Sequence, residues 1–207
     1  MKQDYNQILT DMPDIVGTSA AQNSKAAWDW AQDHCKGMRI NRAWAMPSHD
    51  TLSIKPIEQL VKKYIAVSKN TADPFARNCK LAKWTNDLNP ETSAEYHLLA
   101  SDFLNKIMSE NNIDLVLFDP PYSSYQVKEC YSGAGIGFFQ KDAQNAVRWT
   151  IERDIISKFQ KPGAVVISFG WTTTCMGKKR GYSIKEILMI SHGPAHNDTL
   201  VTVEVKE

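Results

Sequence analysis

Two strongly apolar segments constrain the fold of this chain more than any other feature of its sequence. Residues 113–118 read Ile-Asp-Leu-Val-Leu-Phe and residues 164–169 read Ala-Val-Val-Ile-Ser-Phe. Their length and their content of Val, Ile, Leu and Phe are typical of strands that are buried on both faces. A long helix is predicted between them, over residues 142–159, so the two strands are expected to lie parallel in one sheet.

The same alternation of strands and helices extends over most of the chain. Further strands are predicted at residues 70–75, 81–88 and 96–100, and further helices over residues 56–67 and 101–110. The last two strands, residues 183–191 and 199–205, have only a turn region between them, which indicates an antiparallel pair. The predicted fold class is therefore α/β and Rossmann-like, with a mostly parallel sheet, an antiparallel terminal strand and helices on both faces.

Composition and domain organisation fit one main domain with a leading segment. Residues 1–50 are expected to form an N-terminal extension, with a short helix over residues 20–35, and residues 51–207 to form the main domain. A loop is expected over residues 41–53. Of the 207 residues, 43% are hydrophobic and 23% are charged, which is typical of a globular protein rather than a disordered one.

Several classes of site and location receive no support from the sequence. The four cysteines stand far apart and without metal-ligand spacing, so no metal site is predicted, and a reducing cytoplasm is the simplest location. No segment is apolar for long enough to cross a membrane. The net charge of +1 gives no overall basic excess of the kind that nucleic-acid-binding proteins often have.

Acidic residues follow the predicted strands. Asp73, Asp87, Asp102 and Asp119 each stand at or just past a strand end, and Trp171 stands at another. Ligands of open α/β sheets bind at the carboxyl ends of the parallel strands, so these are candidate site residues. An aspartate in such a place also serves as a turn or helix cap, so the set carries more weight than any one member.

The tetrapeptide after the strongest strand carries the chemistry. Residues 119–122 read Asp-Pro-Pro-Tyr, and here the chain resembles the DNA adenine-N6 methyltransferases, which use S-adenosylmethionine. The resemblance spans about residues 50–206. It implies a Rossmann-like methyltransferase fold in which Asp119, Pro120, Pro121 and Tyr122 are the catalytic residues and DNA is the partner.

A Pro-Pro turn suits this reaction because it lacks backbone donors and presents carbonyl acceptors. Asp119 adds an acceptor carboxylate. Acceptors on the protons of an exocyclic amine favour the positive charge that develops on its nitrogen during methyl transfer. Tyr122 offers a flat face to a base that has been taken out of the stack.

The resemblance also implies which residues hold the cofactor: Lys55, Pro56, Asp73, Pro74, Phe75, Ala76, Asn78, Asp87, Asp102 and Phe103. Asp87 would accept from the ribose hydroxyls and Asp102 from the adenine amino group, although Asp102 equally suits a first helical turn and Phe103 a core position. Arg77 and Asn78 stand near the places of two family glycines. Asn78 is expected to adopt the required positive φ, and Arg77 is expected to reach the substrate or the cofactor carboxylate instead.

Substrate contacts are expected from aromatic and basic residues. Tyr122 and Trp171 would line the base pocket, and Lys178, Lys179 and Arg180 would meet phosphates; the alternatives are a buried tryptophan and a solvated loop. The glycine-rich insert 123–141 is interpreted either as a mobile lid or as a surface loop. The chain has no room for a separate target-recognition domain, which by resemblance suits a small enzyme of a phage or mobile element. The sequence does not indicate an oligomeric state.

Two other functions fit the same residues. The first keeps the chemistry but acts on RNA adenine, on N4 of cytosine or on a protein amide. The second is a binding protein that has kept the methyltransferase fold and lost activity, which the missing family glycines favour. By resemblance, the spelling Asp-Pro-Pro-Tyr favours adenine over cytosine.

Overall fold

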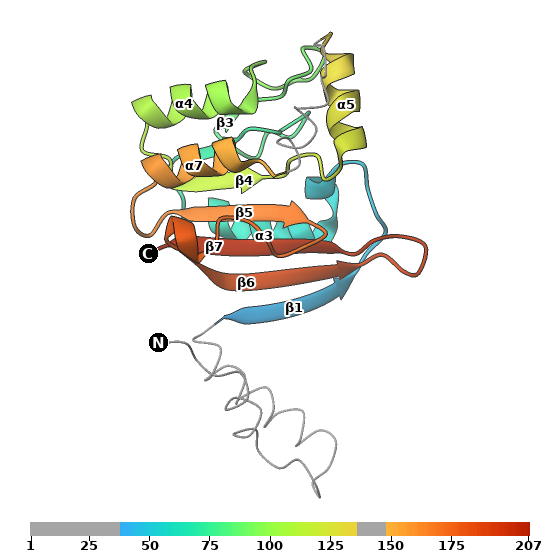
Figure 1. Cartoon of the computed structure of the whole chain (residues 1–207). Coiled ribbons are helices and arrows are strands. Elements are labelled where there is room, and N and C mark those ends of the chain that lie inside the picture. The colour runs from blue at the N-terminus through green and yellow to red at the C-terminus, as the bar shows by residue number, and fades with distance from the viewer. Residues whose placement is uncertain (1–37, 136–147) are drawn as a thin grey trace, which may run out of the picture. The chain divides into compact units, whose positions relative to one another are not determined.

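The computed structural model describes residues 38–135 and 148–207, and its strands form one seven-stranded sheet with the order β1-β6-β7-β5-β4-β2-β3 (Figure 1). The strands are β1 (Arg39–Trp44), β2 (Thr71–Asp73), β3 (Trp84–Thr85), β4 (Leu115–Phe118), β5 (Val165–Gly170), β6 (Tyr182–Ser191) and β7 (Thr199–Lys206). The helices are α3 (Lys55–Ile65), α4 (Ala100–Glu110), α5 (Ser124–Gly133) and α7 (Thr150–Phe159), with 3-10 turns η1 (Thr51–Ser53) and η2 (Lys178–Arg180). The chain divides into compact units between Arg39 and Ile40, and the unit from Ile40 to Glu207 carries the features described below.

The predicted fold class is confirmed. Strands β3, β2, β4 and β5 are parallel to one another, whereas β7 runs antiparallel to both β5 and β6. Strands β6 and β7 are antiparallel because a short turn joins them, while α4 connects β3 to β4 and α5 and α7 connect β4 to β5. The fold is therefore α/β and Rossmann-like, with an antiparallel pair at its end.

Helices cover both faces of the sheet, which explains the apolar strand β4. Leu115 and Leu117 pack in the cluster that contains α3, and Val116 and Phe118 pack in the cluster that contains α4 and α7. None of the four is more than 1% exposed. Successive strand residues point to opposite faces, so burial on both sides requires an unbroken apolar run.

The sheet begins earlier than the sequence indicates. Residues 41–44 were expected to be loop but belong to β1. Directly after this strand, the Ala45 N–H donates to the Ser191 carbonyl (3.2 Å). Strand β1 reads Arg-Ile-Asn-Arg-Ala-Trp and is mostly exposed, so it lacks the apolar alternation that marks a half-buried strand. The expected boundary at residue 50 thus falls after this strand, and the helix predicted over residues 20–35 lies outside the described residues.

The strands at the other edge are shorter than predicted. Only Trp84–Thr85 of residues 81–88 forms a strand, and residues 96–100 contribute only an isolated bridge between Asn86 and Tyr96. The Asn86 side chain takes over the hydrogen bonding there: its Nδ2 donates to the carbonyls of Pro74 (3.0 Å) and Leu98 (3.1 Å), and its Oδ1 accepts from the Leu98 N–H (2.9 Å). A buried side-chain amide therefore replaces part of the ladder.

The insert after residues 119–122 is partly helical rather than a loop. Helix α5 starts with a capping box, in which Ser123 Oγ accepts from the Gln126 N–H (3.3 Å) and Gln126 Oε1 accepts from the Ser123 N–H (3.2 Å). The remainder of the insert, residues 136–141, lies outside the described residues. Of the helix predicted over 142–159, α7 covers only Thr150–Phe159, and residues 142–147 are likewise not described.

The connection from β5 to β6 is unusual because it joins parallel strands without an α-helix. Residues 171–181 make this crossing, with η2 as their only regular element. Glu204 of β7, which is 1% exposed, accepts from the N–H groups of Met176 (2.8 Å) and Gly177 (2.9 Å). A buried carboxylate thus satisfies backbone donors that a helix would otherwise satisfy internally.

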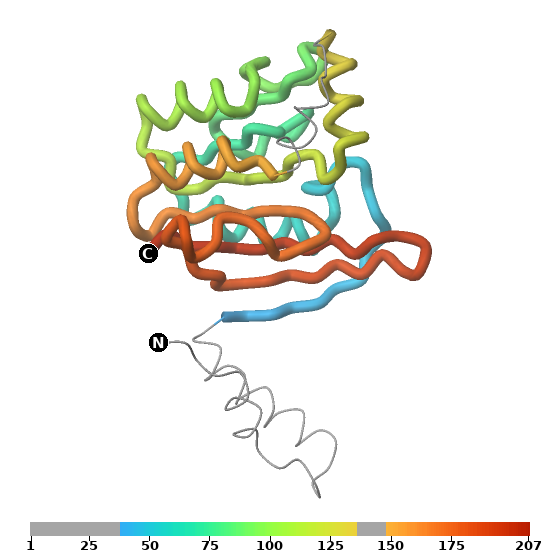
Figure 2. The backbone as a smooth tube through the Cα atoms, in the orientation of Figure 1, coloured from blue at the N-terminus to red at the C-terminus, as the bar shows by residue number. Residues whose placement is uncertain are grey.

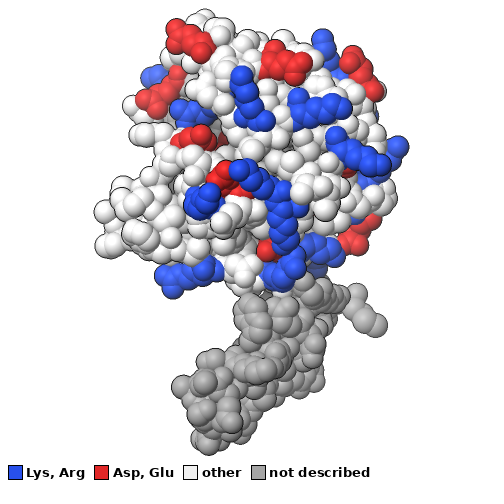
Figure 3. All heavy atoms as spheres, turned by 180° about the vertical axis from the view of Figure 1, so that it is seen from behind, with Lys and Arg blue, Asp and Glu red and all other residues white. Residues whose placement is uncertain are grey.

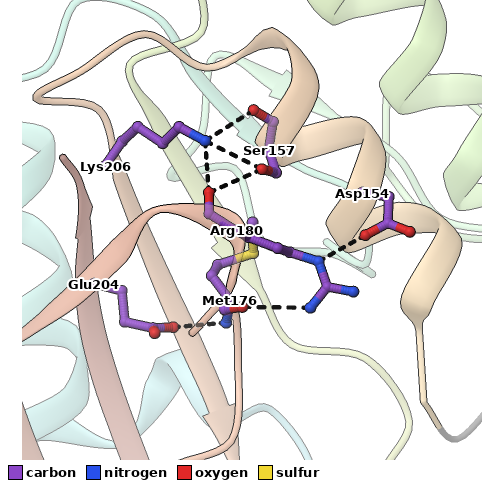
Figure 4. A network of polar contacts seen from close by, with 6 residues as sticks. All are labelled: Asp154, Ser157, Met176, Arg180, Glu204 and Lys206. Carbon is purple, nitrogen blue, oxygen red and sulfur yellow. Dashed lines mark hydrogen bonds and ion pairs between the residues drawn. The ribbon is translucent and has the colours of Figure 1, made fainter. Parts of the chain in front are cut away.

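A second set of contacts ties the same segment to α7 (Figure 4). Arg180 Nε binds Asp154 Oδ1 (2.7 Å), and Lys206 Nζ donates to the carbonyls of Arg180 (2.6 Å) and Ser157 (3.1 Å). Charge-assisted bonds of this kind hold the crossing segment against the helix. Within the described part of the chain, no helix has the length and apolar character needed to cross a membrane.

Replacing Glu204 with Gln should lower the free energy of unfolding by about 1–3 kcal/mol, because an amide has one acceptor oxygen where the carboxylate has two. Urea unfolding, followed by circular dichroism, measures the change. Glu207→Gln is the matched control, since Glu207 is an exposed residue near the same end of the sheet. Equal stabilities of the two variants would contradict this role of Glu204.

Candidate active site

Carboxylates gather at the carboxyl ends of β2, β3 and β4, as the sequence predicts. Asp73 is the last residue of β2, Asp119 directly follows β4, and Asp87 lies two residues after β3. Asp73 is 1% exposed, and its Oδ1 accepts from the Phe75 N–H (3.0 Å). Burial raises the pKa of Asp73 to about 8, and the negative charges of Asp119, Asp87 and Asp50 add to the shift.

Asp119 forms the centre of a small polar cluster. Burial raises its pKa to about 6, and hydrogen bonds from Tyr122 and Thr51 oppose that rise. The Tyr122 hydroxyl donates to Asp119 Oδ1, and its own pKa is raised by burial and by the Asp119 charge. Thr51 lies in η1 and was not anticipated, because no sequence pattern distinguishes it from an ordinary loop threonine.

The proline turn is held in place from two sides. Gln126 Oε1 accepts from the Tyr122 N–H (2.7 Å), and Trp149 Nε1 donates to the Pro121 carbonyl (3.2 Å). Among residues 38–135 and 148–207, no donor contacts the Pro120 carbonyl. The Pro120 carbonyl therefore keeps its acceptor capacity in this turn.

The loop after β2 differs from the expectation in its backbone conformation. Arg77, not Asn78, takes the positive φ (51°), so the prediction for Asn78 is wrong. Asp87 makes this possible, since its Oδ2 accepts from the Arg77 N–H (3.0 Å) and its Oδ1 from the Asn89 N–H (2.9 Å). Hydrogen bonds to the loop backbone compensate for the left-handed conformation, which is unfavourable for a residue with a Cβ.

The Arg77 side chain also departs from the expectation that it reaches a ligand. Its guanidinium donates to the carbonyl of His49 and so ties the loop after β2 to the segment before η1. Its positive charge lowers the pKa of Asp119 slightly against the effect of burial. Asn78 instead binds the Ser93 N–H through Oδ1 (2.9 Å).

The other residues expected to hold the cofactor lie partly beside the carboxylates and partly away from them, in the core or facing solvent. Pro74, Phe75 and Ala76 lie in the loop that follows β2, beside the carboxylates, and the Phe75 ring packs 5.5 Å from that of Phe118. Phe103 is not at the site surface: it is fully buried and packs against Tyr96 (5.5 Å) in the core. Two more positions are solvent-facing, with Asp102 exposed in the first turn of α4 and Lys55, next to Pro56, paired with Glu58 at the start of α3.

A pocket of about 330 Å³ opens beside the Asp119 cluster. Its aromatic walls are Tyr122 and Trp171, whose ring centroids lie 5.6 Å apart at 57°. The lining residues are Pro47, Ser48, Thr51, Ile54, Tyr122, Gln126, Trp171, His192, Ala195, His196, Asn197 and Thr199. Its lining combines these aromatic rings with polar side chains.

The turn between β6 and β7 forms one side of this pocket, and Figure 2 shows it extending beyond the ends of the neighbouring strands. His192 anchors the turn: its Nδ1 lies 2.7 Å from the Ala45 carbonyl and its Nε2 2.8 Å from Thr199 Oγ1. The sequence analysis missed His192, His196 and Asn197, because their spacing indicates no metal and the segment looks like a loop. Within the described residues, no group of His, Cys, Asp and Glu side chains could hold a metal ion.

The basic residues expected to meet phosphates lie at the wrong edge of the sheet. Lys178, Lys179 and Arg180 form η2, which precedes β6 and lies at the amino ends of β5 and β6. Asp119 follows the carboxyl end of β4, which runs parallel to β5. The structure therefore does not bring these three residues to the site, and Arg180 is already bound to Asp154 (Figure 4).

No protein-family model matches the sequence, and no curated protein is significantly similar to it. Among solved structures, the chain is similar to TrmN from Thermus thermophilus, with 13% identity and a TM-score of 0.48 over 74% of this chain and 49% of the TrmN chain. The chain thus spans about half the length of TrmN. It is also similar to a candidate methylase from Haemophilus influenzae, with 14% identity and a TM-score of 0.41 over 74% of this chain and 98% of that one. Likeness at this level does not identify an activity, so the function has to be inferred from the residues themselves.

A pair of substitutions at Arg77 tests the backbone conformation of the loop. Arg77→Gly should be more stable than Arg77→Ala by about 1 kcal/mol, because only glycine adopts a positive φ without steric cost. Both variants lose the same side-chain contact to His49, so the difference isolates the backbone effect. Chemical denaturation measures it, and equal stabilities would contradict a left-handed Arg77.

Proposed function

We propose that this chain is an S-adenosylmethionine-dependent methyltransferase that acts on the exocyclic amine of a nucleobase, with N6 of adenine in DNA as the acceptor. One arrangement carries the proposal: Asp119 and Pro120 offer acceptor oxygens directly beside Tyr122, whose hydroxyl donates to Asp119 and whose ring lines an aromatic-walled pocket. Trp171 and Tyr122, which face this pocket, suit a planar base.

The residues at this edge of the sheet suit the cofactor as well. Carboxyl groups stand together here, and burial raises the pKa of Asp73 to about 8, so a ligand that brings positive charge would favour the ionised form of Asp73. When bound, S-adenosylmethionine supplies an activated methyl group on a sulfonium cation. Asp73 and the loop through Ala76 would hold its methionine part. Asp87 would accept from the ribose with the lone pairs that its two backbone bonds leave free.

Asp119 and Pro120 would act on the amine of the base. An exocyclic amine is a poor nucleophile because its lone pair is delocalised into the ring. Two acceptors that bind its two protons favour the tetrahedral nitrogen and stabilise the positive charge that forms on it. The Tyr122 hydroxyl, which donates to Asp119, keeps the carboxylate oriented toward the pocket.

The surface of the protein suits a nucleic acid only moderately. Figure 3 shows the face that α3 covers, where Lys and Arg side chains are spread among Asp and Glu. Glu58 pairs with both Lys55 and Lys62 on this helix, which neutralises part of the basic charge. Base contacts in the pocket, rather than a continuous basic track on this face, would therefore provide the recognition of DNA.

The decisive experiment incubates the protein with S-adenosylmethionine and DNA, digests the DNA to nucleosides and identifies the methylated nucleoside by mass spectrometry. N6-methyldeoxyadenosine is the expected product. RNA and adenine-free DNA are the comparison substrates, and methylation of either would replace the proposed acceptor with RNA adenine or with cytosine. If calorimetry detects no binding of S-adenosylmethionine, the chain is instead a binding protein that lacks methyltransferase activity.

Asp119→Ala should reduce methyl transfer about a hundredfold to a thousandfold, because it removes a preorganised group that stabilises developing charge. Binding of S-adenosylmethionine should stay within about twofold by calorimetry, since Pro120 and the loop after β2 remain. Asp114→Asn is the matched control, because Asp114 lies at the opposite end of β4 and caps the N–H groups of Lys69 and Asn70. Wild-type turnover in Asp119→Ala would place the active site elsewhere.

The pH dependence follows from the Asp119 pKa of about 6. Below that pH the carboxyl group is protonated and cannot accept from the amine with both oxygens, so transfer is lost as the pH falls. A profile of kcat/KM, which reports the free enzyme, should show an acid limb near pH 6. The acid limb should persist in the Asp73→Asn variant. A flat profile of the wild-type protein, or loss of the acid limb in Asp73→Asn, would contradict the role of Asp119.

A further inference from the structure

We propose that Trp149 is a positioning residue that holds the catalytic turn and the cofactor loop in a fixed relation; this inference deepens the proposed function and rests on it. Trp149 belongs to neither loop in sequence, since it precedes α7. It nonetheless contacts both of them.

Its indole makes two separate contacts. The Nε1–H donates to the Pro121 carbonyl at 3.2 Å, and the ring packs edge-on against Phe75, with centroids 4.9 Å apart at 73°. Only 7% of the residue is exposed, so water does not compete strongly for the N–H. One side chain therefore fixes a carbonyl of the proline turn and an aromatic ring of the loop after β2.

The backbone of Trp149 indicates that this placement is imposed. Its φ of 48° and ψ of 38° lie in the left-handed region, which is uncommon for a bulky residue and unfavourable by about 1–3 kcal/mol. The start of α7 holds it there: the Arg153 N–H donates to the Trp149 carbonyl (3.1 Å), and the Arg153 guanidinium lies 5.9 Å from the ring centroid of Phe118. The start of α7 thus holds Trp149 in the core cluster that contains Phe118, the last residue of β4.

The two contacts have different consequences for the reaction. The N–H bond orients the Pro121 peptide, which leaves the carbonyl of Pro120 and the carboxylate of Asp119 to face the amine. The ring contact fixes Phe75, which lies two residues after Asp73 in the cofactor loop. Loss of the N–H should therefore affect turnover, and loss of the ring should also affect binding of the methyl donor.

Two substitutions separate these effects. Trp149→Phe keeps an aromatic ring and removes the N–H, so kcat should fall about three- to tenfold while the Kd for S-adenosylmethionine stays within about twofold. Trp149→Leu removes the ring as well, so that Kd should rise about three- to tenfold in addition. Trp84→Phe is the control for a tryptophan change on the edge strand β3 and should leave both constants unchanged.

A measurement without turnover completes the test. In nitrogen-15 spectra, the indole signal that disappears in Trp149→Phe should exchange slowly with water and should shift when S-adenosylmethionine is added. Rapid exchange, an unchanged signal, or a Trp149→Phe variant with wild-type kcat would overturn the role of Trp149. Wild-type protein that transfers no methyl group would overturn the proposed function instead, and the exchange measurement would still decide whether Trp149 holds the turn.

Discussion

The partly buried position of Asp119 at the end of β4 is the constraint on which the candidate site depends. Strand β4 lies in the middle of the sheet and is covered on both faces, so the residue that follows it emerges into a poorly solvated region. A carboxylate in such a place interacts strongly with any donor or cation near it. The hydroxyls of Thr51 and Tyr122 donate hydrogen bonds to the Asp119 carboxylate. Its remaining lone pairs can accept further hydrogen bonds from a ligand.

The carboxylates around Asp119 add a second constraint. The charge of Asp119 raises the pKa of Asp73, the charge of Asp50 raises that of Asp119, and the Arg77 charge opposes the second effect only in part. A site of this kind is unfavourable on its own and becomes more favourable when a cationic ligand enters it. The left-handed conformations of Arg77 and Trp149 flank the same region, which agrees with the general tendency of backbone strain to collect at functional sites.

Sequence patterns predicted the parts of this molecule in which local chemistry and burial agree. Residues 113–118 and 164–169 are strands because burial on both faces demands apolar side chains, and Asp119 follows from the first of them. Strand β1 could not be predicted, because its exposed edge position leaves no apolar alternation in the sequence. The basic residues 178–180 were assigned to the wrong edge, because no pattern reveals that residues 171–181 cross the sheet without a helix. Thr51, His192 and Trp149 were missed because their roles come from long-range contacts.

The arrangement of charge also limits how a nucleic acid can approach. The carboxyl groups at the carboxyl edge would repel phosphates when they are ionised, and the cations of η2 lie at the opposite edge. Exposed charges interact over about 8–10 Å at physiological ionic strength. A nucleic-acid backbone held farther from the carboxyl groups would therefore be repelled only weakly. Under the proposed function, a base rotated out of its helix would meet this condition, because it would enter the pocket beside Trp171 while its phosphates remained outside. A cationic methyl donor beside Asp73 would weaken the repulsion further, so donor and nucleic acid should favour each other's binding through charge alone.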